Sequence, residues 1–252
     1  MSDKIPAYVI NLPADVDRRE LMIEQFAKLD RFQLRIMNGC VGSSLPDTVA
    51  FALTRDKNSN SKKGALGCFL SHVAAWEAIS TEQQPVCIVL EDDAIVTALG
   101  KLDQLILPDD AEIIFVNDRM SPKQDETSIH ALPISAALQE LDRSRRGAGT
   151  DGYLLTPAGA RKLLSDCEEK LFFGHVDGRL LRYASTAEDL DALSADSWIR
   201  TVVERHHHHT LRPKLGLVRA YVTSVPLVWH RGGSSSRDRE DSAPAWGETR
   251  PS

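Results

Sequence analysis

The sequence predicts an α/β protein with a mainly parallel central sheet flanked by helices. Two observations carry this prediction. Residues 86–90 (VCIVL) and 112–117 (EIIFVN) are short, nearly continuous apolar runs, as expected of strands buried on both faces of a parallel sheet. Such runs alternate along the chain with longer segments whose apolar residues recur at helical spacing. This alternation is typical of helices that pack against a parallel sheet.

The first third of the chain has a β–α–β pattern. We expect a strand over residues 7–12, a helix from about residue 17, and a strand over residues 33–37. The helix is indicated by Met22, Phe26 and Leu29, which recur at helical spacing on one face. Residues 39–63 are polar and rich in turn-forming types, so they are expected to form a loop.

The remaining elements follow from the same patterns. They are a helix over 66–79, strands over 86–90 and 112–117, a flexible segment over 143–150, a helix from 157, a second helix near 177–183, and strands near 216–222 and 225–229. Leu66, Leu70 and Val73 form the apolar stripe of the first of these helices. Thr156 and Pro157 suit the start of the next, since threonine caps helices and proline tolerates the first turn.

The length of 252 residues fits one sizeable domain. We expect this domain to cover residues 1–231. Residues 232–252 (GGSSSRDREDSAPAWGETRPS) have the polar composition of a mobile tail, or of a lid that folds over a bound ligand.

Composition excludes several classes of function. The net charge of -6 argues against a general nucleic-acid binder, which would carry a basic face. No apolar run is long enough to span a membrane, and the amino terminus lacks the features of a secretory signal. The four cysteines form no CxxC pair and lie in apolar contexts, so they are expected to be reduced thiols of a cytoplasmic protein.

The sharpest chemical feature is an acidic triplet, Glu91-Asp92-Asp93, which directly follows an apolar strand. In open α/β sheets, ligands bind outside the carboxyl ends of the strands, where these residues emerge. Convergent carboxylates repel one another unless a cation lies between them, and their oxygen ligands suit Mg²⁺ or Mn²⁺. The alternative is a solvated acidic loop. The triplet alone does not select a reaction.

Several segments, taken together and in order, resemble glycosyltransferase family 25, which includes bacterial lipooligosaccharide galactosyltransferases and the related collagen galactosyltransferases. The matching segments are YVINLPADVDRR, GALGCFLSHVAAWEAI, IVLEDDAIV, GTDGYLLTPAGARKLL and HVDGRLL. They cover most of residues 7–181. The resemblance implies a GT-A type fold and inverting transfer from a nucleotide-sugar donor, usually UDP-galactose, to a hydroxyl.

The resemblance also assigns roles to the acidic triplet. Asp93 is expected to bind the metal directly, and Glu91 to contact the metal or the ribose of the donor. Asp92 is a further expected contact of the donor. His230, which follows an apolar segment near the end of the chain, is a candidate metal ligand of the kind that GT-A enzymes recruit. Its alternative is an ordinary surface histidine.

Other donor contacts are implied by two further segments. Asn11 and Leu12, with Arg18 or Arg19 pairing with the diphosphate, would form the nucleotide floor. The chain departs from the family pattern here, because Asp15 stands where an arginine is expected. In a second group, Ser71 and His72 lie on a helix from which they could reach the donor. For His72, an internal packing role is the alternative.

The transfer needs a base that removes the proton of the acceptor hydroxyl. By analogy with GT-A enzymes, in which an acid opening a late helix faces the acceptor, Asp177 is the first candidate. Asp151, within a glycine-rich segment, is the second candidate, and its alternative is a turn residue. The expected acceptor is a saccharide, lipid-linked or free. A lipid-linked acceptor would bring the enzyme to the inner face of the membrane as a peripheral protein.

Two other functions stay open. The same acidic strand end would serve a metal-dependent phosphoryl-transfer enzyme, although the chain has no GxxxxGK[ST] loop. The chain could also be a non-catalytic relative that binds nucleotide sugars without turnover. The four consecutive histidines His206–His209 are expected to lie in a polar loop, since neighbouring side chains cannot all converge on one ion.

Overall fold

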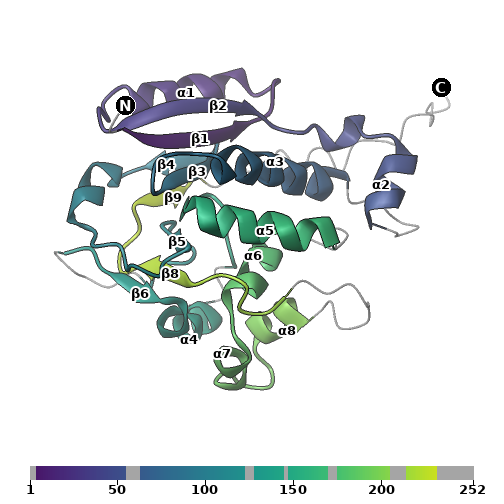
Figure 1. The fold of residues 1–252 in the computed structure, drawn as a ribbon, viewed down its shortest axis with the longest axis vertical. Coiled ribbons are helices and arrows are strands. Elements are labelled where there is room, and N and C mark those ends of the chain that lie inside the picture. The colour runs from purple at the N-terminus through teal and green to yellow at the C-terminus, as the bar shows by residue number, and fades with distance from the viewer. Residues whose placement is uncertain are drawn as a thin grey trace.

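The computed structural model describes residues 4–54, 63–122, 128–144, 147–169, 175–204 and 214–231. Its centre is a seven-stranded sheet covered by helices (Figure 1). The strands of this sheet are β1 (Ile5–Asn11), β2 (Phe32–Asn38), β3 (Cys87–Glu91), β5 (Ile113–Phe115), β6 (Ala131–Pro133), β7 (Gly152–Leu155) and β8 (Ala220–Thr223). A separate two-stranded sheet joins β4 (Ala94–Val96) to β9 (Val228–His230).

The strand order of the main sheet is β2-β1-β3-β7-β5-β8-β6. β1, β2, β3, β5 and β8 point the same way, and only β7 and β6 run against them. The prediction of a mainly parallel sheet is therefore confirmed for strand direction. This mixed α/β architecture is consistent with a GT-A type fold.

The helices differ in how they cover the sheet. They are α1 (Val16–Phe26), α2 (Asp47–Thr54), α3 (Lys63–Ser80), α4 (Ile134–Ser144), α5 (Pro157–Glu169), α6 (Val176–Ala184), α7 (Ala187–Asp191) and α8 (Trp198–Glu204), with short 3₁₀ helices η1 (Gly42–Ser44) and η3 (Leu99–Gln104). α1 and η3 contribute to one apolar core, whereas α3, α4, α5 and α6 contribute to the other. α3 and α5 lie side by side over the sheet (Figure 1).

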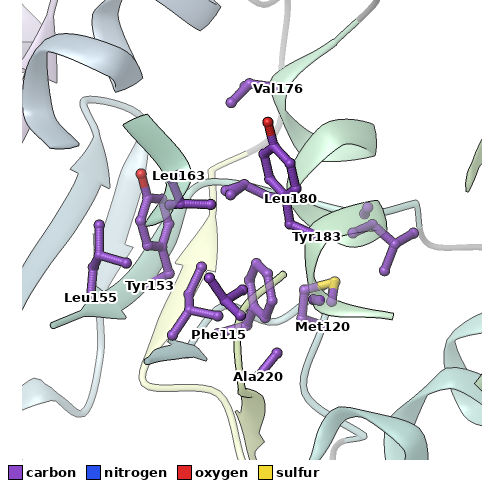
Figure 2. Close-up of a cluster of buried hydrophobic side chains, with 14 of the residues drawn as sticks. Phe115, Met120, Tyr153, Leu155, Leu163, Val176, Leu180, Tyr183 and Ala220 are labelled. Atoms are coloured by element: carbon purple, nitrogen blue, oxygen red, sulfur yellow. The ribbon is translucent and has the colours of Figure 1, made fainter. Parts of the chain in front are cut away.

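The larger core joins the sheet to the carboxyl-terminal helices. Phe115 and Tyr153, from neighbouring strands, belong to this core together with Leu180 and Tyr183 of α6 (Figure 2). Gly67 allows α3 to approach the loop after β2, because a Cβ atom there would lie 2.5 Å from the carbonyl oxygen of Cys40. Thr156 caps α5 as predicted, since its hydroxyl accepts a hydrogen bond from the N–H of Gly159 (3.1 Å).

Several predicted boundaries were wrong. The expected loop over residues 39–63 contains η1 and α2, and α3 already begins at Lys63. The expected flexible segment over residues 143–150 overlaps the end of α4, a helix that was not predicted. The last predicted strand does not join the main sheet, because β9 pairs with β4. The His206–His209 run and the tail over residues 232–252 lie outside the described residues.

Among the described helices, none combines the length and the apolar character needed to cross a membrane.

Candidate functional site

Polar residues from three separate segments meet at the carboxyl edge of the parallel strands. β3 ends at Glu91, and Asp93 follows two residues later. Because β7 is antiparallel to β3, its amino end lies at this same edge, where the N–H of Glu91 donates to the carbonyl oxygen of Asp151 (3.2 Å). The pairing of β4 with β9 sets His230 opposite Ala94, directly beside Asp93. The topology thus gathers residues that are far apart in the sequence.

Asp93, Asp151 and His230 form a compact cluster of potential metal ligands. One ligand atom of each residue lies within 4.8 Å of the others. His230 Nδ1 is 3.2 Å from Asp151 Oδ1 and 4.0 Å from Asp93 Oδ2. In the part of the chain that the structure describes, Asp93 Oδ1 and His230 Nδ1 are buried without a hydrogen-bond partner. Buried polar atoms rarely lack partners, so these two atoms, beside the carboxylate of Asp151, fit a divalent cation such as Mn²⁺ or Mg²⁺.

The electrostatics of this cluster also favour a cation. Burial, together with the charges of Glu91 and Asp151, raises the pKa of Asp93 to about 6. The nearby carboxylate of Asp151 raises the pKa of His230. The charged form of Asp93 is therefore costly near neutral pH in the metal-free protein, and a cation between the carboxylates removes this cost.

Arg119, which sequence reasoning missed, lies against Asp151. Its Nε donates to Asp151 Oδ2 (2.8 Å) and its Nη2 donates to Asp151 Oδ1 (2.6 Å). Paired charge-assisted hydrogen bonds of this kind fix both the position and the plane of a carboxylate. Arg119 follows the strand run EIIFV within the sequence NDR, so its place after a buried strand was a signal that could have been used.

Asn117 holds the two segments that carry this pair. Its side chain is fully buried, and its Oδ1 accepts hydrogen bonds from the N–H groups of Arg119 (3.1 Å) and Met120 (3.0 Å). Its Nδ2 donates to the carbonyl oxygens of Gly149 (2.9 Å) and Gly152 (3.1 Å). Asn117 therefore ties the turn after β5 to the segment that precedes β7.

A second polar group extends from the acidic triplet to β1 and α1. Asn11 Nδ2 donates to Asp92 Oδ2 (2.7 Å) and to the carbonyl oxygen of Asp15 (2.9 Å). Arg18 Nη1 donates to Asp92 Oδ1 (3.1 Å) and lies 3.7 Å from Asp93 Oδ2. The structure thus brings three predicted donor contacts, Asn11, Arg18 and Asp92, together beside Asp93.

Leu12 and Arg19, the other two predicted donor contacts of this region, make no hydrogen bond or ion pair with the acidic triplet among the described residues. Leu12 is half-buried directly after β1, and Arg19 is half-buried in α1. The backbone N–H of Arg19 donates to the carbonyl oxygen of Asp15 (3.2 Å). Asp15 itself precedes α1 without a side-chain capping bond.

Glu91 has different neighbours from Asp93. The hydroxyl of Thr150 donates to Glu91 Oε1, and His72 Nε2 lies 3.4 Å from the same oxygen. Burial opposes ionisation of Glu91, but His72, Thr150 and the charge of Arg119 together lower its pKa to about 2. The sequence grouped Glu91 with Asp93 and His230 as metal ligands, whereas in the structure Asp151 takes the third place in that cluster.

Ser71 and His72 lie inside the protein on α3. The hydroxyl of Ser71 donates to the carbonyl oxygen of Gly67 (2.7 Å) and accepts from the N–H of Cys40 (2.8 Å). His72 is fully buried, and its Nδ1 is 2.9 Å from the hydroxyl oxygen of Tyr153. Ser71 is thus an internal hydrogen-bonding residue, and His72 is held through Nδ1 while its Nε2 faces Glu91.

Asp177 lies in the first turn of α6, half-buried. Its Oδ1 accepts a hydrogen bond from the N–H of Gly178 (2.9 Å). Burial lowers the pKa of Arg119, but the charges of Asp151, Glu91 and Asp177 outweigh it and raise that pKa. Asp177 is therefore within electrostatic range of Arg119, which holds Asp151, although it is not one of the three grouped ligands.

The sequence of this chain is similar to a known protein family and to individual proteins. The family model described as Glycosyltransferase family 25 (LPS biosynthesis protein) matches residues 4–177. Human "Procollagen galactosyltransferase 2" is 29% identical over 176 residues, which cover 62% of this chain and 27% of the relative. Bovine "Probable inactive glycosyltransferase 25 family member 3" is 29% identical over 174 residues, which cover 63% of this chain and 28% of the relative.

A frog relative, "Procollagen galactosyltransferase 1-A" of Xenopus laevis, is 28% identical over 177 residues, which cover 63% of this chain and 28% of its own length. The matched region thus spans less than a third of each of these relatives. Their names include both a transferase activity and an inactive member. Because the family model covers well over half of the sequence, and because the fold agrees with it, the chain belongs to glycosyltransferase family 25.

Proposed function

We propose that this chain is an inverting, metal-dependent glycosyltransferase that moves galactose from UDP-galactose to a saccharide hydroxyl. The observation that carries the proposal is the convergence of Asp93, Asp151 and His230 at the carboxyl edge of the sheet, in a chain of glycosyltransferase family 25. The names of the procollagen galactosyltransferases support galactose as the sugar.

In this proposal, Asp93, Asp151 and His230 hold a divalent cation, preferably Mn²⁺. When bound, such an ion supplies Lewis-acid stabilisation of the charge that develops on the departing diphosphate. Arg119 holds Asp151 in place through two hydrogen bonds. Arg18 fixes Asp92 and lies near Asp93, so it organises the acidic residues beside the proposed nucleotide floor at Asn11.

Asp177 is the proposed base. It would accept the proton of the acceptor hydroxyl as the oxygen of that hydroxyl attacks the anomeric carbon and the bond to the diphosphate breaks. Asp151 is the other candidate of the sequence, but both of its oxygens accept hydrogen bonds from Arg119 and one faces His230. These contacts favour Asp151 as a ligand and Asp177 as the base.

The acceptor and the location of the enzyme in the cell are proposed from the family resemblance. A saccharide of a lipooligosaccharide or another glycan fits the family, and a lipid-linked acceptor would imply peripheral contact with the inner face of the membrane. Residues 1–231 would form the catalytic domain, and residues 232–252 would serve as a tail or a lid.

The test is a transfer assay that separates donor binding from turnover. UDP-galactose is compared with UDP-glucose, GDP-mannose and a CMP-sugar in the presence of Mn²⁺ and a panel of saccharide acceptors. Asp177→Asn should bind the donor like the wild-type protein but lose transfer, whereas Asp93→Asn should lose both. Asp191→Asn, in which a highly exposed carboxylate of α7 is changed, is the matched control and should keep both activities.

Transfer at the wild-type rate by Asp177→Asn would show that another group is the base. Tight donor binding with no transfer to any acceptor in the wild-type protein would instead support a non-catalytic relative, as the name of the bovine "Probable inactive glycosyltransferase 25 family member 3" suggests for that protein. Release of inorganic phosphate from the nucleotide, without sugar transfer, would support the phosphoryl-transfer alternative.

A further inference from the structure

A second cluster of potential ligands lies next to the first and has a different chemistry. It consists of Cys68, His72 and Glu91, whose ligand atoms lie within 4.8 Å of one another. Cys68 and His72 are four residues apart on α3, so both side chains lie on one face of the helix, and Glu91 reaches them from the end of β3. A thiol, an imidazole and a carboxylate are the groups that bind Zn²⁺ in proteins.

His72 is the residue that points to a ligand. Its side chain is fully buried, and its Nε2 has no hydrogen-bond partner among the described residues. This atom lies 3.4 Å from Glu91 Oε1, so it is directed into the cluster. Buried ring nitrogens are nearly always hydrogen-bonded or bound to a metal.

The opposite side of the imidazole is already held. His72 Nδ1 lies 2.9 Å from the hydroxyl oxygen of Tyr153, and that oxygen also accepts a hydrogen bond from Trp76 Nε1 (2.8 Å). When Nδ1 carries the proton and donates it to Tyr153, the lone pair of Nε2 faces the carboxylate of Glu91. Two acceptors in such contact repel one another, and a cation between them removes this repulsion. Zinc binding would therefore select this tautomer of His72 over the one whose Nε2 donates to Glu91. A partner that orients the second ring nitrogen is the usual support of a metal-binding histidine.

We propose that Cys68, His72 and Glu91 form a zinc site that is separate from the Asp93 cluster. The site goes beyond the proposed transferase activity and does not depend on it. Its thiolate and imidazole favour borderline-soft Zn²⁺, whereas the carboxylate-rich Asp93 cluster favours Mn²⁺ or Mg²⁺. Cys68 and Glu91 are each only partly buried, which gives an ion a path to the buried nitrogen of His72.

The experiment is a zinc titration of metal-stripped full-length chain by isothermal calorimetry. All proteins carry alanine in place of the four histidines His206–His209, because that run could bind zinc on its own. Cys68→Ser, a nearly isosteric change, should weaken Zn²⁺ binding by about tenfold or more, and Tyr153→Phe by about 10- to 100-fold. Cys40→Ser is the matched control, since Cys40 is also a partly buried cysteine outside any disulfide, and it should bind like the parent protein.

A second pair of measurements separates the two clusters. Asp93→Asn should keep the affinity for Zn²⁺, and Co²⁺ should give a sulfur-to-metal charge-transfer band that Cys68→Ser lacks. A cooperative thermal transition of Cys68→Ser shows that any loss of binding is local. Unchanged zinc affinity in Cys68→Ser, or zinc binding that is lost in Asp93→Asn and retained in Cys68→Ser, overturns the proposal.

Discussion

Replacing Asp93 by asparagine should stabilise the metal-free protein near neutral pH and abolish its response to Mn²⁺. Asp93 is 8% exposed, and burial together with three neighbouring carboxylates raises its pKa from 3.8 to about 6. Asparagine keeps the shape of the side chain but carries no charge. The variant therefore avoids the repulsion among carboxylates that the wild-type protein experiences without a cation.

The size of this effect depends on pH. An acid whose pKa is higher in the folded protein than in the unfolded chain loses stabilising free energy as the pH rises through the folded value. For a shift from 3.8 to about 6, this loss is at most about 3 kcal/mol once the pH is well above 6. At about 2–4 °C per kcal/mol for a chain of this length, Asp93→Asn should melt up to about 12 °C above the wild-type protein.

The assay is thermal unfolding in a chelator at about pH 4 and about pH 7.5, followed by the same series with Mn²⁺. The two proteins should melt at nearly the same temperature at the lower pH and separate at the higher pH. Mn²⁺ at about 100 times its dissociation constant should add about 2.7 kcal/mol to the wild-type protein and nothing to the variant. Asp191→Asn controls for the loss of an exposed charge. A lower melting temperature for Asp93→Asn at the higher pH would refute the reasoning.

Two further substitutions test the surroundings of the site. Gly149→Ala should weaken Mn²⁺ binding in a calorimetric titration, because a Cβ atom there would lie 2.3 Å from Arg119 Nε and 2.6 Å from Asp151 Oδ2. Gly100→Ala is the control and should bind Mn²⁺ normally, because the nearest atom to a Cβ there is 3.8 Å away. Thr156→Ala removes the cap of α5 and should lower the free energy of unfolding, measured in urea, by about 1 kcal/mol, with Mn²⁺ binding unchanged. A loss of Mn²⁺ binding free energy larger than the loss of unfolding free energy would contradict this account.

The sequence predicted the elements whose burial is uniform. β1, β3 and α3 are buried along most of their length, so their apolar runs are visible in the sequence. α2 was missed because it buries only Ala50 and Thr54 and leaves Phe51 half exposed, which gives no apolar stripe. The three-residue strands β4 and β6 were missed because pairing partners, not composition, define such short segments.

α4 is a different kind of error. Ile134, Ala137, Leu138 and Leu141 recur at helical spacing and are all buried. The signal was therefore present in the sequence, and only the neighbouring flexible composition concealed it.

For the candidate site, the sequence could place residues at strand ends but not across the sheet. Asp93 and His230 were both predicted as ligands, and the structure brings them close together. The position of Asp151 could not be predicted, because it follows from β7 running antiparallel between two parallel strands. Arg119 follows a buried strand, which the sequence does show, but its role depends on its contact with Asp151, which only the fold reveals.

The central claim is that Asp93, Asp151 and His230 bind a cation that coordinates the diphosphate of the donor. The most direct test is calorimetric titration of UDP into the metal-free chain and into the chain saturated with Mn²⁺. This account predicts that UDP binds the wild-type protein only when Mn²⁺ is present, and that Asp93→Asn binds UDP in neither condition. Equal affinity for UDP with and without Mn²⁺ would contradict the claim.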